Sequence, residues 1–350
     1  MPEPQTRLSF DGECVLLNGD PTLPGRRYRG TSLSGLLPNA RMVQAVFDDE
    51  TPDTVGQWAY PDTGEWDPDR NVTEFVDALP TYYDRGLRAV TVCLQGGRPS
   101  IGNRSNPERV SAFRPDGSLK AAWMDRLARV LDRADELGMV VIVGYFYFGQ
   151  DDVFDDETAI RAATRNVTDW LLEHEYHNVI VEVNNECNHS LWDHDLFGPA
   201  QIPELIELVA SCTRDGRRLP VGTSFGGGVV PTPDVIEASD VALLHGNGVD
   251  DPARIADMIA ETRAITGENP IPIIFNEDDN HGFGSYPNNM AVALEHGASW
   301  GYYSGGRNDY RSGFQSPPVQ WAITTPEKEA FFRYVEAITR PDAVFAEPDH

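Results

Sequence analysis

Short apolar, β-branched runs alternate along this chain with longer segments whose apolar residues recur with the period of a helix. This alternation is typical of a parallel sheet, because each parallel strand needs a crossover that returns the chain to the same end. Eight such runs are predicted to be strands: 28–34, 87–94, 139–146, 179–186, 219–224, 241–245, 272–276 and 299–304. Each is followed by helical or helix-compatible sequence, which predicts a (β/α)8 TIM barrel of the α/β class.

A short β-hairpin is predicted before the barrel, over residues 8–18 around Asp11 and Gly12. Helices are predicted at 72–86, 119–137, 156–175, from near Pro203, and at 252–266, 288–296 and 326–339. Ser118 and Gly138 supply start and stop signals for the second of these. No repeat or linker divides the sequence, so residues 1–350 are predicted to form one domain. A doubly wound open sheet is the alternative, but no glycine-rich phosphate loop follows the first run.

Two of the apolar runs end in a glutamate. Residues 179–186 read VIVEVNNE and residues 272–277 read PIIFNE, so Glu186 and Glu277 close two predicted strands. Strand carboxyl ends form the face where barrel enzymes place their active sites. Cleavage of a glycosidic bond uses two such carboxyl groups, which lie about 5–5.5 Å apart when one of them is the nucleophile. We expect the negative charge of one to raise the pKa of the other, the general acid. Glutamates that only cap helices or bind loop arginines are the structural alternative.

Residues 179–186 resemble the acid/base strand of the clan A glycoside hydrolases, most of all that of the cellulase-like family five. Residues 272–277 are similar to the nucleophile strand of that clan, and the segments LNGDP and YRGTS near the N-terminus look like the first strand of the family. The resemblance implies a retaining glycoside hydrolase with Glu186 as acid/base and Glu277 as nucleophile. It also implies that Asn185 contacts the sugar and that His245 lies near the nucleophile.

The sequence departs from this family pattern beside the expected substrate. Cys187 stands where a proline usually follows the acid/base glutamate, and Asp278 and Asp279 replace an aromatic residue and a glycine. Tyr303 takes the place of the tryptophan that usually floors the cleaved sugar. The clan is therefore better supported than the family, and the sugar, the linkage and the choice between internal and terminal cleavage stay open.

Long loops after the first, second and eighth predicted strands carry aromatic side chains among polar ones. Aromatic faces stack on sugar rings while polar groups reach hydroxyls, although the same rings can also pin a loop onto a barrel. The side chains predicted to contact carbohydrate are Asn185, His245, Tyr147, Gln95, Tyr303, Trp58 and Trp300.

The chain is strongly acidic, with 55 Asp and Glu against 28 Lys and Arg and a formal net charge of −27. Its field repels nucleic acid and anionic membranes, so carbohydrate is the expected partner; the oligomeric state is not predicted. The lysines, Lys120 and Lys328, both lie in predicted helices, which argues against a Schiff-base mechanism at the barrel mouth.

The four cysteines show no CxxC pairing, which favours free thiols in a reducing compartment. The first residues lack the basic and apolar regions of an export signal, and no run is long enough to span a membrane. These features predict a cytoplasmic protein for the chain as given, although a chain trimmed of an export signal would look the same.

Two clusters of acidic residues and histidine, at 189–195 and 278–281, offer ligand types that suit zinc or manganese. A metal-dependent barrel hydrolase or isomerase is therefore one alternative, and a non-catalytic carbohydrate-binding barrel is another. No HExxH motif is present, and so acidic a chain needs no metal to explain these clusters. We therefore predict neither a metal nor a cofactor.

Overall fold

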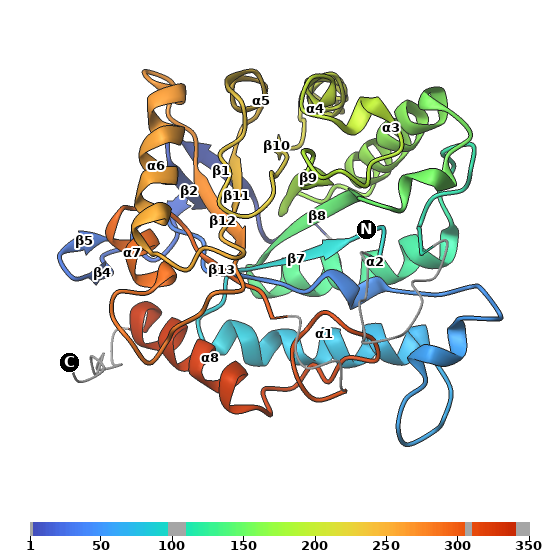
Figure 1. Ribbon diagram of the computed structural model, residues 1–350, viewed down its shortest axis with the longest axis horizontal. Coiled ribbons are helices and arrows are strands. Elements are labelled where there is room, and N and C mark those ends of the chain that lie inside the picture. The colour runs from blue at the N-terminus through green and yellow to red at the C-terminus, as the bar shows by residue number, and fades with distance from the viewer. Residues whose placement is uncertain (1–2, 97–109, 305–309, 341–350) are drawn as a thin grey trace.

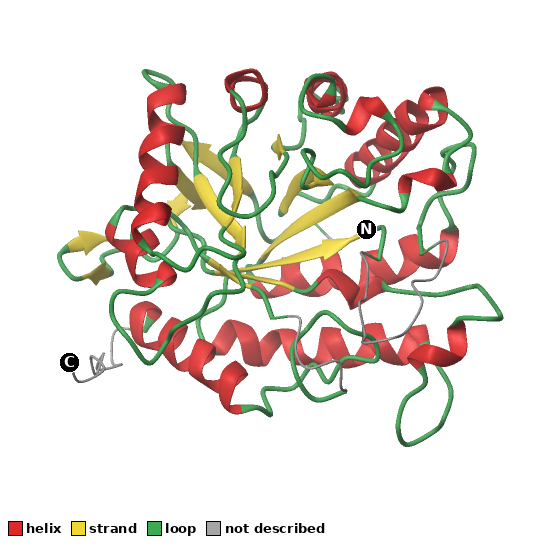
Figure 2. Ribbon diagram, viewed as in Figure 1, coloured by secondary structure: helices red, strands yellow, loops and turns green. Residues whose placement is uncertain are grey.

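The computed structural model describes residues 3–96, 110–304 and 310–340. Within these residues, eight parallel strands form a central ring that helices surround (Figure 1, Figure 2). The strands are β6 (Asn39–Arg41), β7 (Ala89–Cys93), β8 (Val140–Tyr147), β9 (Val179–Asn185), β10 (Val221–Gly222), β11 (Ala242–His245), β12 (Ile273–Glu277) and β13 (Gly301–Tyr302). One α-helix follows each strand, and the predicted (β/α)8 TIM barrel is confirmed.

The α-helices, in the order of the strands they follow, are α1 (Pro68–Asp84), α2 (Ala121–Leu137), α3 (Glu157–Glu173), α4 (Ile202–Ser211), α5 (Pro233–Ala238), α6 (Ala253–Thr266), α7 (Asn289–Glu295) and α8 (Pro326–Thr339). Short 3-10 helices lie in the loops: η1 (Val43–Val46), η2 (Val55–Trp58), η3 (Asp151–Val153) and η4 (Asp195–Phe197). Gly138 ends α2 with φ +77°, as predicted. Lys120 rather than Ser118 precedes α2, without a capping side-chain hydrogen bond.

Backbone pairing closes the strands into a ring. Ladders join six of them in the order β10-β9-β8-β7-β6-β13, and β11 pairs with β12. Two shorter links complete the circle: the amide of Asp240 donates to the carbonyl of Val221 at 2.8 Å, and Ser299 bridges to Ile274. A closed ring leaves no long sheet edge exposed, and its strand carboxyl ends all meet at one mouth.

The first barrel strand is not the predicted one at 28–34. The segments Arg27–Tyr28 (β4) and Thr31–Ser32 (β5) pair with each other as a small antiparallel hairpin that turns at Gly30, φ +93°. The barrel strand β6 comes later and is the short polar sequence Asn-Ala-Arg. Its polar side chains are buried in the barrel, so it lacks the apolar run that marks most parallel strands.

The predicted N-terminal hairpin is confirmed and closes the end of the barrel opposite the mouth. The strands β1 (Leu8–Asp11) and β2 (Cys14–Leu17) pair in antiparallel fashion, and β3 (Asp20–Pro21) extends them. Val15 of β2 packs into the interior cluster with Ile142 and Ile180 of the barrel strands. The interior cluster at this end of the barrel is therefore apolar, whereas polar side chains are buried at the mouth.

The longest loops described lie at the mouth, after β6 and after β13, as the positions of the strand ends require. Part of the loop after β7 falls outside the described residues. Among the residues described, no helix combines the length and the apolar character needed to cross a lipid bilayer.

Candidate active site

A buried arginine stands at the centre of the barrel mouth. Arg41 ends β6 and has no exposed surface. Its guanidinium donates to Glu182 Oε2 at 3.0 Å and to Asn185 Oδ1 at 2.5 Å, and its Nε forms an ion pair with Glu277. Burial lowers the pKa of Arg41, but the carboxylates of Glu182 and Glu277 outweigh burial and raise it. One cation thus links three strands that lie far apart along the chain.

The two predicted catalytic glutamates come together at this mouth. Glu186 directly follows β9 and Glu277 ends β12, and one carboxylate oxygen of each lies within 4.8 Å of the other. The exposed fraction of the side chain is 13% for Glu186 and 5% for Glu277. Both carboxylates are therefore largely desolvated, yet Glu186 remains the more accessible of the two.

His245, at the end of β11, joins the same cluster. Its Nδ1 lies 3.0 Å from Glu186 Oε1 and 3.7 Å from Glu277 Oε2, while its Nε2 lies 3.7 Å from Glu182 Oε1. Burial alone would lower the pKa of His245, but Glu277, Glu182 and Glu186 together raise it to about 9. The imidazole is consequently protonated at neutral pH.

The charge on His245 changes the expectation for Glu186. Burial raises the pKa of Glu186, but the hydrogen bond and the positive charge of His245 outweigh it, and the pKa is lowered. The expected rise caused by a neighbouring carboxylate is therefore absent in the resting structure. The proton needed by a general acid lies instead on the imidazole at 3.0 Å.

The backbone at Glu186 is unusual. Its φ of +52° lies in the left-handed region, which side chains other than glycine rarely adopt. Ser224 Oγ accepts a hydrogen bond from its amide, and Trp192 Nε1 donates to its carbonyl, both at 3.0 Å. These contacts hold the turn that ends the strand.

Strand alternation does not continue to this turn. A regular pleat would place Asn185 on the side opposite to Glu182, but Arg41 binds both. Asn184 instead donates to the carbonyl of Phe197 in the following loop. The strand end therefore differs from a regular pleat.

Asn247 is a further site residue that the sequence alone did not single out for this role. Its Nδ2 donates to Glu277 Oε1 at 2.5 Å, so Glu277 is held on one oxygen by Asn247 and on the other by Arg41. The available signal was its position two residues after His245, at the end of a predicted strand.

Two tyrosines among the predicted carbohydrate contacts lie at the mouth. Burial raises the pKa of Tyr147 and that of Tyr303, and the negative charge of Glu277 adds to the rise in both. Glu186 acts on both phenols in the same direction. Their hydroxyls thus stand within electrostatic reach of both glutamates.

Three other predicted contacts are buried and hold parts of the fold together. Gln95 donates to Ser111 Oγ at 3.1 Å and accepts from the amide of Tyr147 at 2.8 Å, so it joins the loop after β7 to the end of β8. Trp58 is fully buried, and its indole donates to Asp49 at 2.7 Å.

Trp300 is 1% exposed, and its indole donates to Asp278 at 2.8 Å. The rings of Trp58 and Trp300 both stabilise the folded loops and strands, and neither has a free face for a sugar. The sequence could not show this, because burial depends on partners that are distant along the chain.

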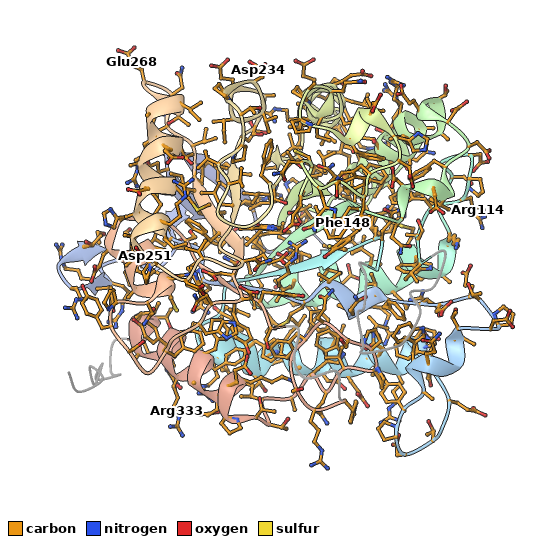
Figure 3. The ribbon with its side chains drawn as sticks, in the orientation of Figure 1. Arg114, Phe148, Asp234, Asp251, Glu268 and Arg333 are labelled. Atoms are coloured by element: carbon orange, nitrogen blue, oxygen red, sulfur yellow. The ribbon has the colours of Figure 1, made fainter. Side chains whose placement is uncertain are left out.

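The two clusters considered for metal binding are engaged in other contacts. The ring of His189 stacks on Phe148, a side chain labelled in Figure 3, with centroids 3.8 Å apart. His281 lies 3.3 Å from Glu327, and Asp278 accepts from Trp300.

Among the described residues, the one group of three ligand-type side chains that approach closely is Glu186, His245 and Glu277. The guanidinium of Arg41 already pairs with Glu277 there. His245 is protonated in the same cluster, so a metal ion would meet two positive charges there, and the donor set does not fit one.

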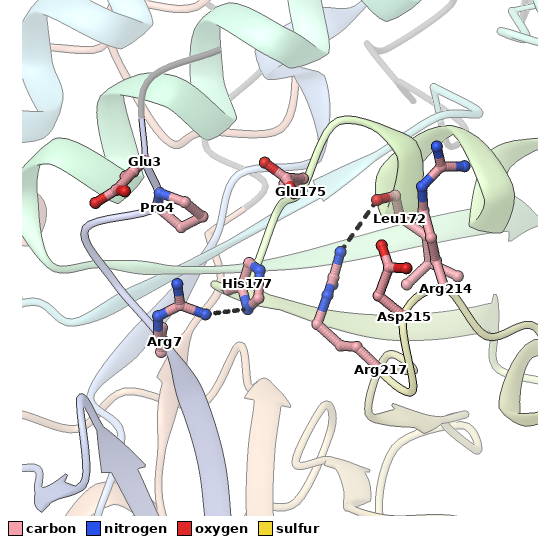
Figure 4. A pocket seen from close by; sticks show the side chains of 9 residues that line it. All are labelled: Glu3, Pro4, Arg7, Leu172, Glu175, His177, Arg214, Asp215 and Arg217. Carbon is pink, nitrogen blue, oxygen red and sulfur yellow. Dashed lines mark hydrogen bonds between the residues drawn. The ribbon is translucent and has the colours of Figure 1, made fainter.

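A separate cavity of about 420 Å³ lies at the other end of the barrel (Figure 4). Arg7 donates to His177 Nδ1 at 3.2 Å, and Arg217 donates to the carbonyl of Leu172 at 3.1 Å. His177 precedes β9 and Arg217 precedes β10, so this cavity belongs to the N-terminal ends of the strands. It is distinct from the glutamate cluster.

No family model matches the sequence, and no curated protein matches it. Solved structures do match its fold. A candidate glycoside hydrolase from Bacteroides vulgatus has 12% identity and a TM-score of 0.58 over 95% of this chain, which spans 61% of that protein. A glycoside hydrolase family 5 enzyme from Prevotella bryantii has 12% identity and a TM-score of 0.55 over 87% of this chain and 96% of its own.

An endo-β-1,4-glucanase from Bacillus licheniformis, solved with cellotetraose, has 13% identity and a TM-score of 0.52 over 88% of this chain and 60% of its own. At such identities the likeness shows the fold alone, which is a (β/α)8 barrel.

Proposed function

We propose that this barrel is a retaining glycoside hydrolase that cleaves an O-glycosidic bond of an oligosaccharide or polysaccharide by double displacement. The observation that carries the proposal is the approach of Glu186 and Glu277, whose nearest oxygens lie within 4.8 Å at the barrel mouth. Retaining enzymes place their two carboxyl groups about 5–5.5 Å apart, whereas inverting ones leave about 6.5–9.5 Å for a water. The spacing therefore favours direct attack by one carboxylate.

Glu277 is the proposed nucleophile because its orientation is fixed on both oxygens. Arg41 pairs with one and Asn247 donates to the other. Both contacts orient the carboxylate, and attack on the anomeric carbon requires such an oriented nucleophile.

Glu186 is the proposed acid/base. It is more exposed than Glu277, and a hydrogen-bonded histidine stands behind it. It passes a proton to the leaving oxygen in the first step, and it removes a proton from water in the second.

Asn185 is proposed to bind a hydroxyl of the sugar at the cleaved bond. Its Oδ1 accepts from Arg41, but its Nδ2 is buried without a hydrogen-bond partner. A buried donor without a partner costs about 1–3 kcal/mol, and a substrate hydroxyl beside it would remove that cost.

The charge of the cluster suits the reaction. Three carboxylates, Glu182, Glu186 and Glu277, face two cations, Arg41 and His245, in a largely buried site. The excess negative charge stabilises the oxocarbenium-like transition state, which carries positive charge at the anomeric carbon. The carboxylates also make the mouth unsuitable for an anionic substrate.

Two substitutions test the assignment on aryl glycosides of the sugar that a substrate panel identifies. We expect Glu277→Gln to reduce turnover below detection, because the amide cannot attack. We expect Glu186→Ala to slow an unactivated substrate by about 10²–10⁴-fold. The same variant should keep measurable cleavage of a 2,4-dinitrophenyl glycoside, whose leaving group needs no proton.

Glu204→Gln is the matched control, since Glu204 lies on α4 and pairs with Arg161 at the surface. It should keep the wild-type rate. Near-wild-type turnover by Glu277→Gln, or a product of inverted anomeric configuration by NMR, would contradict the proposal.

A further inference from the structure

Glu182 is a fully buried carboxylate beneath the two catalytic glutamates. It lies on β9, four residues before Glu186, and has no exposed surface. Its Oε2 accepts from Arg41 at 3.0 Å, and its Oε1 accepts from Asn276 Nδ2 at 3.1 Å. The same Oε1 lies 3.7 Å from His245 Nε2. Glu182 therefore touches the cation beside Glu277 and the imidazole beside Glu186.

We propose that Glu182 is a positioning residue that keeps a proton on His245, and that His245 and Glu186 share this proton as the acid of the reaction. The inference rests on the proposed glycosidase function and deepens it. It assigns to Glu182, which lies on the Nε2 side of the imidazole, a role that neither catalytic glutamate can fill.

The proton moves as follows in the first step. A Glu277 oxygen forms a bond to the anomeric carbon, and the bond from that carbon to the leaving oxygen breaks with its electron pair on oxygen. Glu186 gives that oxygen a proton and receives one from His245 Nδ1 across 3.0 Å. His245 ends the step neutral.

The second step reverses these transfers. A water oxygen attacks the anomeric carbon, its proton passes to Glu186 and on to His245, and the bond to Glu277 breaks with its electron pair on the carboxylate. Atoms and charges thus balance over the cycle, and no other reactant than water enters.

Glu182 is needed because its charge does not change during the cycle. The groups that face His245 are Glu182 and Glu186 on and after β9 and Glu277 on β12, with Arg41 of β6 behind Glu182. Glu277 loses its charge when it bonds to the sugar, and Glu186 loses its charge when it holds the proton. Of the three carboxylates, Glu182 is the one that keeps its charge in every state and faces the imidazole throughout the cycle.

The protonation states agree with this geometry. Burial raises the pKa of Glu182, but Arg41 and then His245 outweigh it and lower the pKa to about 2, so Glu182 is ionised throughout the working range. The pKa of His245 is about 9, and the shared proton is therefore present up to that pH. The alkaline limb of the pH profile of kcat/KM should therefore mark the loss of this shared proton.

The test compares the pH dependence of kcat/KM for wild type and Glu182→Gln, which keeps the shape of the side chain and removes its charge. With an unactivated aryl glycoside, the wild-type alkaline limb should lie near pH 9. In the variant it should move to lower pH by about one unit or more, which is about a tenfold loss of activity for each unit. With a 2,4-dinitrophenyl glycoside, cleavage of the first bond should depend much less on this limb. Glu204→Gln should keep the wild-type profile.

An unmoved alkaline limb in Glu182→Gln would overturn the inference. If that variant does not fold, ¹⁵N NMR of the histidines in the wild-type protein decides, with the His245 signal assigned by its loss in His245→Gln. Protonation of both ring nitrogens at pH 7.5 supports the inference, and a neutral ring overturns it. Either result is independent of the Glu277→Gln assay. Near-wild-type turnover by Glu277→Gln would contradict the glycosidase function itself.

Discussion

At the scale of single residues, Arg41 organises the mouth of the barrel. It has no exposed surface, and it contacts Glu182 and Asn185 near the end of one strand and Glu277 at the end of another. A buried cation is stable only where carboxylates replace its lost hydration. The arrangement of the catalytic groups therefore depends on this one side chain.

Replacement of Arg41 should destabilise the fold as well as the site. Arg41→Met keeps an unbranched apolar stem but leaves Glu182 and Glu277 without their cation. Loss of one partner of a buried pair costs about 3–5 kcal/mol of the free energy of unfolding, measured by urea denaturation. Arg161→Met, which removes an exposed pair with Glu204, should cost about 0–1 kcal/mol. Equal losses in the two variants would contradict a structural role for the buried pair.

The sequence predicted some residues of the site and missed others for a definite reason. Glu186, Glu277 and His245 each close an apolar run, so the strand pattern itself marked their positions. Arg41 closes a polar strand of three residues, which no apolar run marks. Glu182 was placed on the correct strand, but its partners come from three other segments and could not be read from that strand.

At the scale of elements, the N-terminal hairpin acts as the floor of the barrel. Val15 of β2 is fully buried among Ala89, Val140 and Ile180 of the barrel strands. The barrel interior is thus apolar at this end and ionic at the mouth. Stability and chemistry occupy opposite ends of the same strands, as is general for this architecture.

A cavity in this floor should weaken the fold without changing the site. Val15→Ala is expected to lower the free energy of unfolding by about 1.5–3 kcal/mol, because it removes buried methyl groups. The KM of the active substrate should stay at its wild-type value. Val229→Ala removes a side chain that is 41% exposed and should change stability by at most about 0.5 kcal/mol. A change in KM caused by Val15→Ala would show that the two ends are coupled.

The strands were predicted correctly where the runs were apolar and long, and the prediction was wrong at β6. The segments Arg27–Tyr28 and Thr31–Ser32 have strand propensity, but they satisfy it locally by pairing with each other. The strands β10 and β13 have two residues each, far shorter than predicted. Helices such as Pro326–Thr339 matched closely, because caps and periodicity are local signals.

At the scale of the whole molecule, the net charge of −27 is the dominant property. Surface arginines pair with many of the carboxylates, but the excess of Asp and Glu leaves a repulsive field over the fold. Salt screens such a field, because the Debye length falls from about 30 Å at 0.01 M to about 3 Å at 1 M.

Thermal stability should therefore rise with ionic strength. We expect Tm, measured by calorimetry, to increase between 0.01 and 0.5 M NaCl, by about 1–2 °C for each kcal/mol of repulsion that is screened. A neutral osmolyte at equal osmolality controls for changes in water activity. A Tm that falls with added salt would mean that surface ion pairs outweigh the net repulsion.

The sequence by itself determined the barrel class, the floor hairpin, most helices and the two glutamates at strand ends, because each rests on local periodicity or on the position where a run stops. Only the tertiary structure decided that Arg41 and Glu182 lie under those glutamates, that Asn247 holds Glu277, and that Trp58 and Trp300 are buried. These facts depend on which segments meet across the closed ring. Burial and pairing among residues on different strands set the charges there, and no single segment encodes them.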